Sequence, residues 1–329
     1  MRSSHKLLIT TLGAFLIFSV PFIASAQSEE AVEEPVDTHV FSDVDVGHPE
    51  YVALKYLKEK GILEGYNDGS FKPGNLINRI EALKIILEAN GTITDDYVEQ
   101  NRLGGSNYST NLDLVSFSDI YKSQWYFPYL KKGVEEGVVQ GYEDGTFRPI
   151  ITVNRVESFK MVMEDDDVVL PEVTENPYVD VNMNEWFAPY IQEAKLRQII
   201  YVMMNGTVNP GREMTRSKFA ELVYRYMKSK EGAMFGKGSY YHDSLEGNGT
   251  SSGEPYRAAE LTAAHRTLPF NTVVKVTNLA NGAEVTVRIN DRGPFITGRV
   301  IDLSRSAFET IAHPGTGVIW VEYEIINEV

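Results

Sequence analysis

Residues 117–163 read FSDIYKSQWYFPYLKKGVEEGVVQGYEDGTFRPIITVNRVESFKMVM, and the chain carries three versions of this stretch. The other two begin at Phe41 and Tyr178. In every copy an arginine follows the opening aromatic residue after 38 positions, at Arg79, Arg155 and Arg216. A match of this length is hard to obtain by chance, so the front half of the chain is a repeat array.

Each copy is predicted to form a helix, a glycine-rich turn and a second helix. In the second copy, apolar residues recur at helical spacing, at Tyr126, Tyr129, Leu130, Val134 and Val138. The following GYEDGTFRP is typical of a turn with glycine at positive φ, and Asn154 or Thr215 is placed to cap the next helix. Because one short hairpin cannot bury its own apolar face, we expect the three copies to pack together.

The pattern changes at Met234, where short β-rich segments replace the helical periodicity. TVVKVTNL, AEVTVRI, RVIDL and VIWVEYEII alternate with the turns ANG and NDRGPF. One helical piece is predicted near residues 304–311, where Ser304 and Ser306 indicate a helix cap. Short strands of this kind predict a small closed β-barrel over residues 234–329.

Composition and charge narrow the class of protein. The chain has no cysteine, so disulfides and thiol chemistry are excluded. Its net charge is −15, of which only −3 falls on residues 234–329. An acidic front half argues against nucleic acid as a partner, because such binding depends on neutralising phosphates.

Residues 1–26 have the pattern of a secretory signal. Arg2 and Lys6 precede an apolar run over residues 7–23, and Ala24-Ser25-Ala26 follows. We expect cleavage after Ala26 and a secreted protein, with an uncleaved membrane anchor as the alternative. No later segment is apolar enough to span a bilayer, so the mature protein is expected to have no membrane span.

The repeats resemble S-layer homology (SLH) domains. They share the aromatic-x-D opening, the W-x-x-P-Y stretch, the G-Y-x-D-G-[ST]-F-[KR]-P turn and a helix start like T-R-A-E. The resemblance implies a multidomain chain in which an α-helical, pseudo-threefold SLH bundle precedes the barrel. The expected segments are the signal peptide 1–26, an acidic linker 27–40, repeat 41–91, an insertion 92–116, repeat 117–164, a linker 165–177, repeat 178–230 and the barrel 234–329.

The SLH resemblance also implies binding of an anionic secondary cell-wall polymer, often pyruvylated. On that resemblance the wall-polymer-binding residues are Arg79, Arg155, Arg216, Trp125, Trp186, Gly65 and Gly141. A guanidinium near a helix N-terminus suits a carboxylate or phosphate. The alternative is that each arginine bonds the turn carbonyls of its own repeat. The third copy departs from the pattern, since its turn is NGTVNP and Lys218 replaces the acidic residue, so we expect Arg79 and Arg155 to matter more than Arg216.

Residues 236–329 resemble the catalytic domain of the rare lipoprotein A (RlpA) family, a six-stranded double-psi β-barrel. G-E-x-Y, L-T-A-A-H-x-T-L-P-F, V-T-N-L-x-N-G and R-I-N-D-R-G-P-F-x-x-G-R-x-I-D-L-S carry the resemblance. RlpA proteins are lytic transglycosylases acting on the glycan strands of peptidoglycan. The resemblance places the catalytic residues at Asp291, His265 and Glu254, and implies no cofactor.

A lytic transglycosylase needs one group that first protonates the leaving oxygen and then accepts the proton of the attacking 6-hydroxyl. Asp291, at a strand end, suits both parts, and we expect burial or a nearby carboxylate to raise its pKa. His265 is its expected hydrogen-bond partner, and Glu254 supports charge or substrate position. Arg292 would lower that pKa unless it points away, toward Asp302 or a backbone carbonyl.

Structural roles remain open for these residues. Asp291 could cap its turn through the amides of RGP, His265 could be a half-buried core histidine and Glu254 a turn carboxylate. Asp302 is predicted to be structural. The histidines are not at metal-ligand spacing, so no metal site is expected.

Three functions therefore compete. The leading hypothesis is an enzyme of the cell envelope that cleaves glycan strands while the SLH repeats retain it at the wall. The second is an expansin-like module that binds or loosens wall glycans without cleaving them. The third is a structural tether in which the barrel is a spacer.

Overall fold

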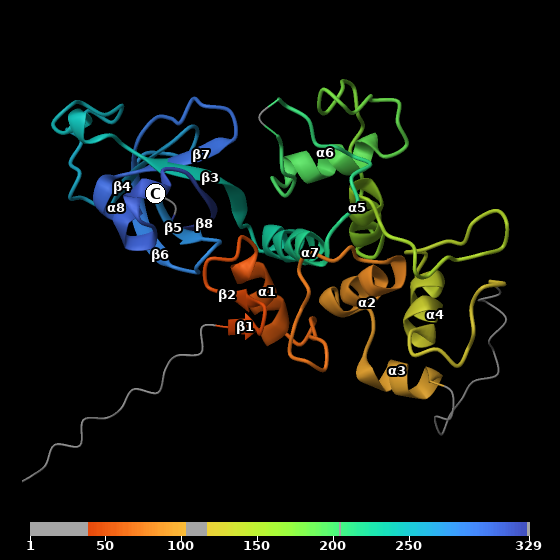
Figure 1. Cartoon of the computed structure of the whole chain (residues 1–329). Helices are drawn as coiled ribbons and strands as arrows, with labels where there is room; N and C mark the ends of the chain where they lie inside the picture. Colours follow the sequence, from red (N-terminus) through yellow and green to blue (C-terminus); the bar gives the residue numbers. More distant parts are fainter. Residues whose placement is uncertain (1–38, 103–116, 204, 328–329) are drawn as a thin grey trace, which may run out of the picture. The chain divides into compact units, whose positions relative to one another are not determined.

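The computed structural model describes residues 39–102, 117–203 and 205–327 (Figure 1). The predicted signal peptide, its cleavage site after Ala26, the linker up to residue 38 and residues 103–116 of the insertion lie outside these ranges. In the described part of the chain, no helix is long and apolar enough to cross a membrane.

Each repeat contributes two helices joined by its glycine turn, as predicted. The helix pairs are α1 (Tyr51–Glu59) and α2 (Arg79–Ala89), α4 (Phe127–Glu135) and α5 (Arg155–Glu164), and α6 (Ala188–Leu196) and α7 (Arg216–Lys230). A short hairpin precedes α1, formed by β1 (His39–Phe41) and β2 (Val44–Asp45). Helix α3 (Asp95–Asn101) lies in the insertion, for which the sequence analysis made no prediction of secondary structure.

The aspartate that follows the opening aromatic residue holds the glycine turn of its own repeat. In the second repeat the Asp119 carboxylate accepts the amides of Phe147 and Arg148 at 2.8 and 2.6 Å. Asp43 and Asp180 accept the equivalent amides in the other repeats. The spacing between this aspartate and the glycine turn, which is the same in all three repeats, therefore has a structural reason.

The second helix of each repeat begins at the predicted cap. Asn154 and Asn78 form complete capping boxes with Glu157 and Glu81, which satisfies amides that have no partner inside the helix. In the third repeat Thr215 accepts from the amide of Lys218 at 3.3 Å, and the lysine cannot return the second bond. These observations confirm the predicted capping roles of Asn154 and Thr215.

The repeats close into a ring through the segments that precede these helices. The amide of Arg79 donates to Ile151, that of Arg155 to Arg212, and that of Arg216 to Asn75, at 2.8 to 2.9 Å. The first repeat thus pairs with the second, the second with the third, and the third with the first. This cyclic pairing is what the predicted pseudo-threefold bundle requires.

The barrel is closed and six-stranded, which confirms the predicted fold. Its strands are β3 (Met234–Tyr240), β4 (Thr262–His265), β5 (Val273–Asn278), β6 (Glu284–Asp291), β7 (Arg299–Leu303) and β8 (Ile319–Asn327). They run in the closed order β3-β7-β4-β6-β5-β8, with two parallel pairs, β3 with β7 and β4 with β6. Helix α8 (Arg305–Ile311) covers part of the barrel core, and Ser304 caps it as predicted.

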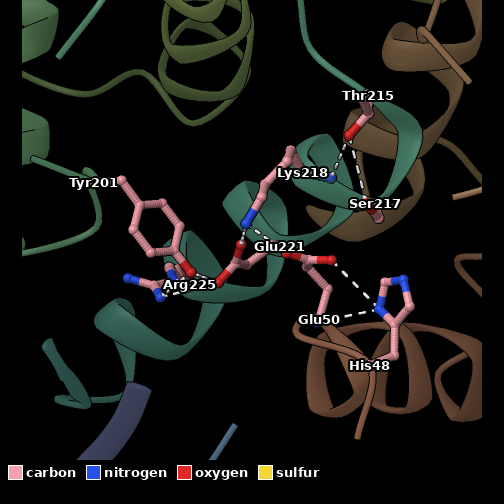
Figure 2. Close-up of polar contacts among 8 residues, drawn as sticks. All are labelled: His48, Glu50, Tyr201, Thr215, Ser217, Lys218, Glu221 and Arg225. Atoms are coloured by element: carbon pink, nitrogen blue, oxygen red, sulfur yellow. Dashed lines mark hydrogen bonds and ion pairs between the residues drawn. The ribbon is translucent and has the colours of Figure 1, made fainter. Parts of the chain in front are cut away.

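Lys218, the residue that departs from the repeat pattern, is the partly exposed member of a charge network whose other members are buried (Figure 2). It pairs with Glu50 of the first repeat and with Glu221 on its own helix. Glu221 also pairs with Arg225, and both side chains are almost fully buried. Because a buried charge is costly without a partner, this network fixes α7 against the first repeat.

The same face of α7 contacts the barrel. The Tyr224 hydroxyl donates to the Glu322 carboxylate of β8, and the Arg225 guanidinium lies 5.1 Å from the Trp320 ring centre. Tyr201 meets Trp320 edge-on at 4.3 Å. Apolar residues of β3 and of the turn after β5, Phe235 and Leu279, join the core of the repeats.

Candidate functional site

Asp291 ends β6 and is half-buried, and its carboxylate accepts four hydrogen bonds. The Tyr241 hydroxyl donates at 2.7 Å, and Ser251 donates from both its amide and its hydroxyl at 2.7 Å. The amide of Arg292 donates at 2.8 Å. Two separate chain segments and the amide of the next residue therefore hold this carboxylate in one orientation at the end of the strand.

These donors determine the charge of Asp291. Burial raises its pKa, but the hydrogen bonds from Tyr241, Ser251 and the Arg292 amide outweigh burial and leave the pKa below its usual value. The expectation of a raised pKa for Asp291 is therefore wrong in this structure. Burial and the bond to Asp291 raise the pKa of Tyr241, so the phenol stays protonated and remains a donor.

Arg292 does not pair with the Asp291 carboxylate through its guanidinium. Its Nη1 atom donates to the carbonyl of Leu268 at 2.8 Å and to that of His265 at 3.3 Å. The guanidinium also lies 3.9 Å from the Phe270 ring centre. Of the two expected directions, toward Asp302 or toward a backbone carbonyl, the structure shows the second.

Glu254 lies at the same end of β6 as Asp291. Arg288 donates to both of its carboxylate oxygens at 2.9 and 2.8 Å, and the Asn290 side chain donates at 3.2 Å. These bonds, the Arg288 pair first, lower the pKa of Glu254. Ser251, which bonds Asp291, stands three residues before Glu254, so one loop carries both contacts.

His265 is buried and turned away from Asp291. Ala264, not His265, is the register partner of Asp291, and successive side chains of a strand face opposite sides. His265 Nδ1 accepts the amides of Thr267 and Leu268 at 3.2 and 3.0 Å, so Nε2 carries the proton toward the Tyr323 hydroxyl at 3.2 Å. The expected hydrogen bond to Asp291 is absent among the described contacts of the two residues.

The environment of His265 also fixes its charge. Burial, followed by the nearby Arg292 and Arg266 guanidinium groups, lowers its pKa to about 4. The ring is therefore neutral near pH 7 and orders the loop after β4. Its predicted place in catalysis remains a prediction.

Asp302 is structural, as predicted. Ser239 donates to it at 2.7 Å and the Arg299 Nε atom at 3.1 Å. The sequence analysis missed Tyr241, Ser251 and Arg288, which hold the two acidic residues. Tyr241 and Ser251 lie in the same RlpA-like stretch as Glu254, so that resemblance was an available signal.

The three repeat arginines bond carbonyls of the next repeat, not of their own. Arg79 donates to Gln140 at 3.2 Å, Arg216 to Phe71 at 3.0 Å, and Arg155 to Val208. The sequence analysis considered polymer binding and bonding to the turn carbonyls of the same repeat, and it did not anticipate bonds that join each arginine to the next repeat. Burial lowers the pKa of Arg155.

Arg216 also lines an open cleft of about 580 Å³ between the first two repeats. Tyr66, Glu81, Lys84, Trp125 and Gly65 lie along it. A smaller hollow of about 20 Å³ lies beside Arg155. The sequence favoured Arg79 and Arg155 as ligand residues, whereas the larger of these two clefts lies beside Arg216, whose nearly buried guanidinium pairs with Glu81 at 3.4 Å.

The turn glycines have a packing reason of their own. A Cβ atom at Gly141 would lie 2.1 Å from the Phe117 ring, and one at Gly65 would lie 2.9 Å from the Ser70 carbonyl. Trp125 and Trp186 are about half exposed. Their roles in polymer binding stay predictions. Among the residues that the structure describes, no cluster of acidic or histidine side chains could hold a metal.

Two family models match the chain. Residues 233–323 match the lytic transglycolase family, and residues 40–83, 116–149 and 177–220 match the S-layer homology domain. The chain therefore combines three S-layer homology domains with a barrel domain of the lytic transglycolase type.

Individual relatives resemble the barrel domain. The endolytic peptidoglycan transglycosylase RlpA of Pasteurella multocida is 50% identical over 107 residues, which are 32% of this chain and 36% of the relative. RlpA of Campylobacter jejuni is 50% identical over 92 residues, 28% of this chain and 34% of the relative. The probable RlpA of Synechocystis is 54% identical over 92 residues, 28% of this chain and 29% of the relative. The chain thus spans about a third of the length of these curated relatives.

Proposed function

We propose that the protein is an exported, wall-attached lytic transglycosylase. It cleaves the bond between N-acetylmuramic acid and N-acetylglucosamine in peptidoglycan and leaves 1,6-anhydromuramyl ends. The observation that carries the proposal is the Asp291 carboxylate, held at the end of β6 by directed donors within a barrel that is about half identical to RlpA proteins.

Asp291 acts as acid and then as base. A glycan strand that covers the half-buried carboxylate removes more water from it, which strengthens the burial effect that raises its pKa. The carboxyl group then takes up a proton and gives it to the leaving glycosidic oxygen as the bond to the anomeric carbon breaks. The 6-hydroxyl oxygen bonds that carbon, its proton returns to Asp291, and no water is consumed.

The neighbouring residues support this cycle in different ways. Tyr241 and Ser251 fix the orientation of the carboxylate and stabilise its ionised form, which is the form that results when the proton leaves. Glu254, ionised and paired with Arg288, borders the same end of the strand and positions the glycan. His265 contributes indirectly, by ordering the loop whose carbonyls hold Arg292.

The SLH repeats retain the enzyme at the cell envelope by binding an anionic, pyruvylated wall polymer. The cleft beside Arg216 supports this part of the proposal through its volume and the half-exposed Trp125 ring. Its cations are paired within the chain, Arg216 with Glu81 and Lys84 with Glu88, so an anionic polymer must displace these glutamates to reach them. Secretion with cleavage after Ala26 belongs to the same proposal.

The test is to incubate the full chain with purified peptidoglycan and to determine the masses of the released fragments. Anhydromuramyl ends, which lack one water relative to reducing ends, are the expected result. Reducing ends would indicate hydrolysis and overturn the proposed mechanism. Binding to the insoluble glycan without release of fragments would favour the expansin-like module.

A further inference from the structure

A second cleft is lined by the third repeat and the barrel, and it shares no lining residue with the hydrogen-bond donors of Asp291. It has a volume of about 550 Å³, and its cationic residues are Lys195, Lys237, Arg266 and Arg299. We call it the basic cleft. Lys237 lies on β3, Arg266 follows β4, Arg299 begins β7, and Lys195 comes from α6 of the third repeat. The volume is in the range of small-molecule sites.

The charge of this cleft contrasts with that of the chain. Among the residues that the structure describes, its lining contains no aspartate or glutamate, although the chain has a net charge of −15. His265 also lines the cleft, but with its pKa lowered to about 4 it is neutral near pH 7. A cleft lined by one sign of charge concentrates its field and attracts ions of the opposite sign.

Three of the four cations have neutral partners only, among the described residues. Lys195 donates to the Pro177 carbonyl at 3.1 Å, and Lys237 lies 5.3 Å from the Trp320 ring centre. Arg266 bonds three backbone carbonyls, two of them at 2.9 and 3.2 Å. The fourth, Arg299, pairs with Asp302. Within the described ranges, three of these positive charges therefore have no carboxylate partner.

The wall of the cleft is held in place before any ligand binds. Trp320 packs against Tyr201, at 4.3 Å edge-on, and against the fully buried Arg225. The carbonyl bonds of Arg266 tie it to the segment that follows the Asp291 turn. A fixed site loses less conformational entropy on binding than a mobile one.

We propose that the basic cleft binds a short anionic saccharide that bears carboxylate or phosphate groups. Ammonium and guanidinium groups form strong, charge-assisted hydrogen bonds with both kinds of group. Trp320 and Tyr178 supply an apolar surface for the sugar. The cleft is separate from the Arg216 cleft and does not depend on glycan cleavage, so it can be tested independently of the proposed function.

The experiment measures binding of three probes to the full chain by calorimetry at low salt. Tetragalacturonate carries carboxylates, a glycerol phosphate tetramer carries phosphates, and chitotetraose is neutral. The test variant combines Lys195→Gln with Lys237→Gln, two side chains that bond no carboxylate in the described part of the chain. Lys122→Gln, on the exposed surface of the second repeat and outside the cleft, is the matched control.

We expect one of the anionic probes to bind and the double variant to bind it about tenfold more weakly, as loss of two partly exposed charge contacts predicts. The probe that binds identifies the source as a carboxylate or a phosphate polymer. The proposal is overturned if neither anionic probe binds, if chitotetraose binds equally well, or if the control weakens binding as much as the double variant. If the double variant unfolds at a lower temperature than the wild type, the single variant Lys195→Gln replaces it. The same binding criteria then apply to that single variant.

Discussion

Protonation of His265 should destabilise the folded chain, and the size of the effect follows from its surroundings. Its ordinary pKa is 6.5, and burial with two nearby guanidinium groups lowers it to about 4. The folded state therefore binds this proton less readily than the unfolded state does. The stabilisation is complete above pH 6.5 and is lost as the pH falls toward 4.

A pKa difference of about 2.5 units corresponds to about 3 kcal/mol of unfolding free energy, at about 1.4 kcal/mol per unit. The side chain is only 7% exposed, so solvent screening does not reduce this figure much. A change of this size is a large fraction of the stability of an ordinary domain.

The assay is urea unfolding of the wild type and of His265→Gln at several pH values between 7 and 4. Glutamine cannot titrate, so the wild type should lose about 3 kcal/mol more than the variant over this range. Tyr323→Phe is the matched control, because it removes the hydroxyl beside Nε2 but keeps the titrating ring. Parallel curves for the wild type and His265→Gln would refute the assignment of a buried, neutral histidine.

Three further predictions concern other parts of the chain. Gly141→Ala should destabilise the protein by about 1–3 kcal/mol in thermal unfolding, because the new Cβ atom would lie 2.1 Å from an atom of the Phe117 ring. Gly211→Ala is the control, since a Cβ atom there would have no other atom within 4 Å, and equal destabilisation by both substitutions would contradict the packing argument. Tyr241→Phe removes a hydrogen-bond donor to the Asp291 carboxylate and should raise the pKa of Asp291. Because the protonated Asp291 is the acid, the pH above which kcat/KM falls should then move upward. An unshifted pH–rate profile would count against this role of Tyr241. Trp125→Ala should weaken the affinity for cell walls about tenfold, measured by sedimentation, while the circular dichroism spectrum stays unchanged. Sedimentation equal to that of the wild type would show that Trp125 is not part of the polymer site.

Much of the fold follows from local sequence patterns. The cap at Asn154 and the glycine turns could be predicted because each depends on residues close together in the chain. The ring of repeats is different, since the bonds from Arg79 to Gln140 and from Arg216 to Phe71 join residues far apart in sequence. The repeat pattern identifies these arginines but does not say which repeat receives them.

The candidate site shows the same division. Asp291 could be identified from its place at the end of an alternating strand followed by a polar turn. Its low pKa could not, because Tyr241 and Ser251 are 50 and 40 residues away and reach it only when the barrel closes. His265 follows a strand residue paired with Asp291, so a shift of one position in register decides which face it occupies.

The most direct test of the central claim compares Asp291→Asn with the wild type in release of anhydromuramyl fragments from peptidoglycan. Asparagine keeps the shape of the side chain but cannot transfer the proton, and loss of proton transfer typically lowers the rate by about 10²–10⁴-fold. Asp302→Asn is the matched control: it removes a carboxylate that bonds Ser239 and Arg299, and it should act through stability. We predict that the Asp291 variant still binds the glycan but releases almost no fragments. Release at close to the wild-type rate would contradict the account and move the search for the proton donor to Glu254.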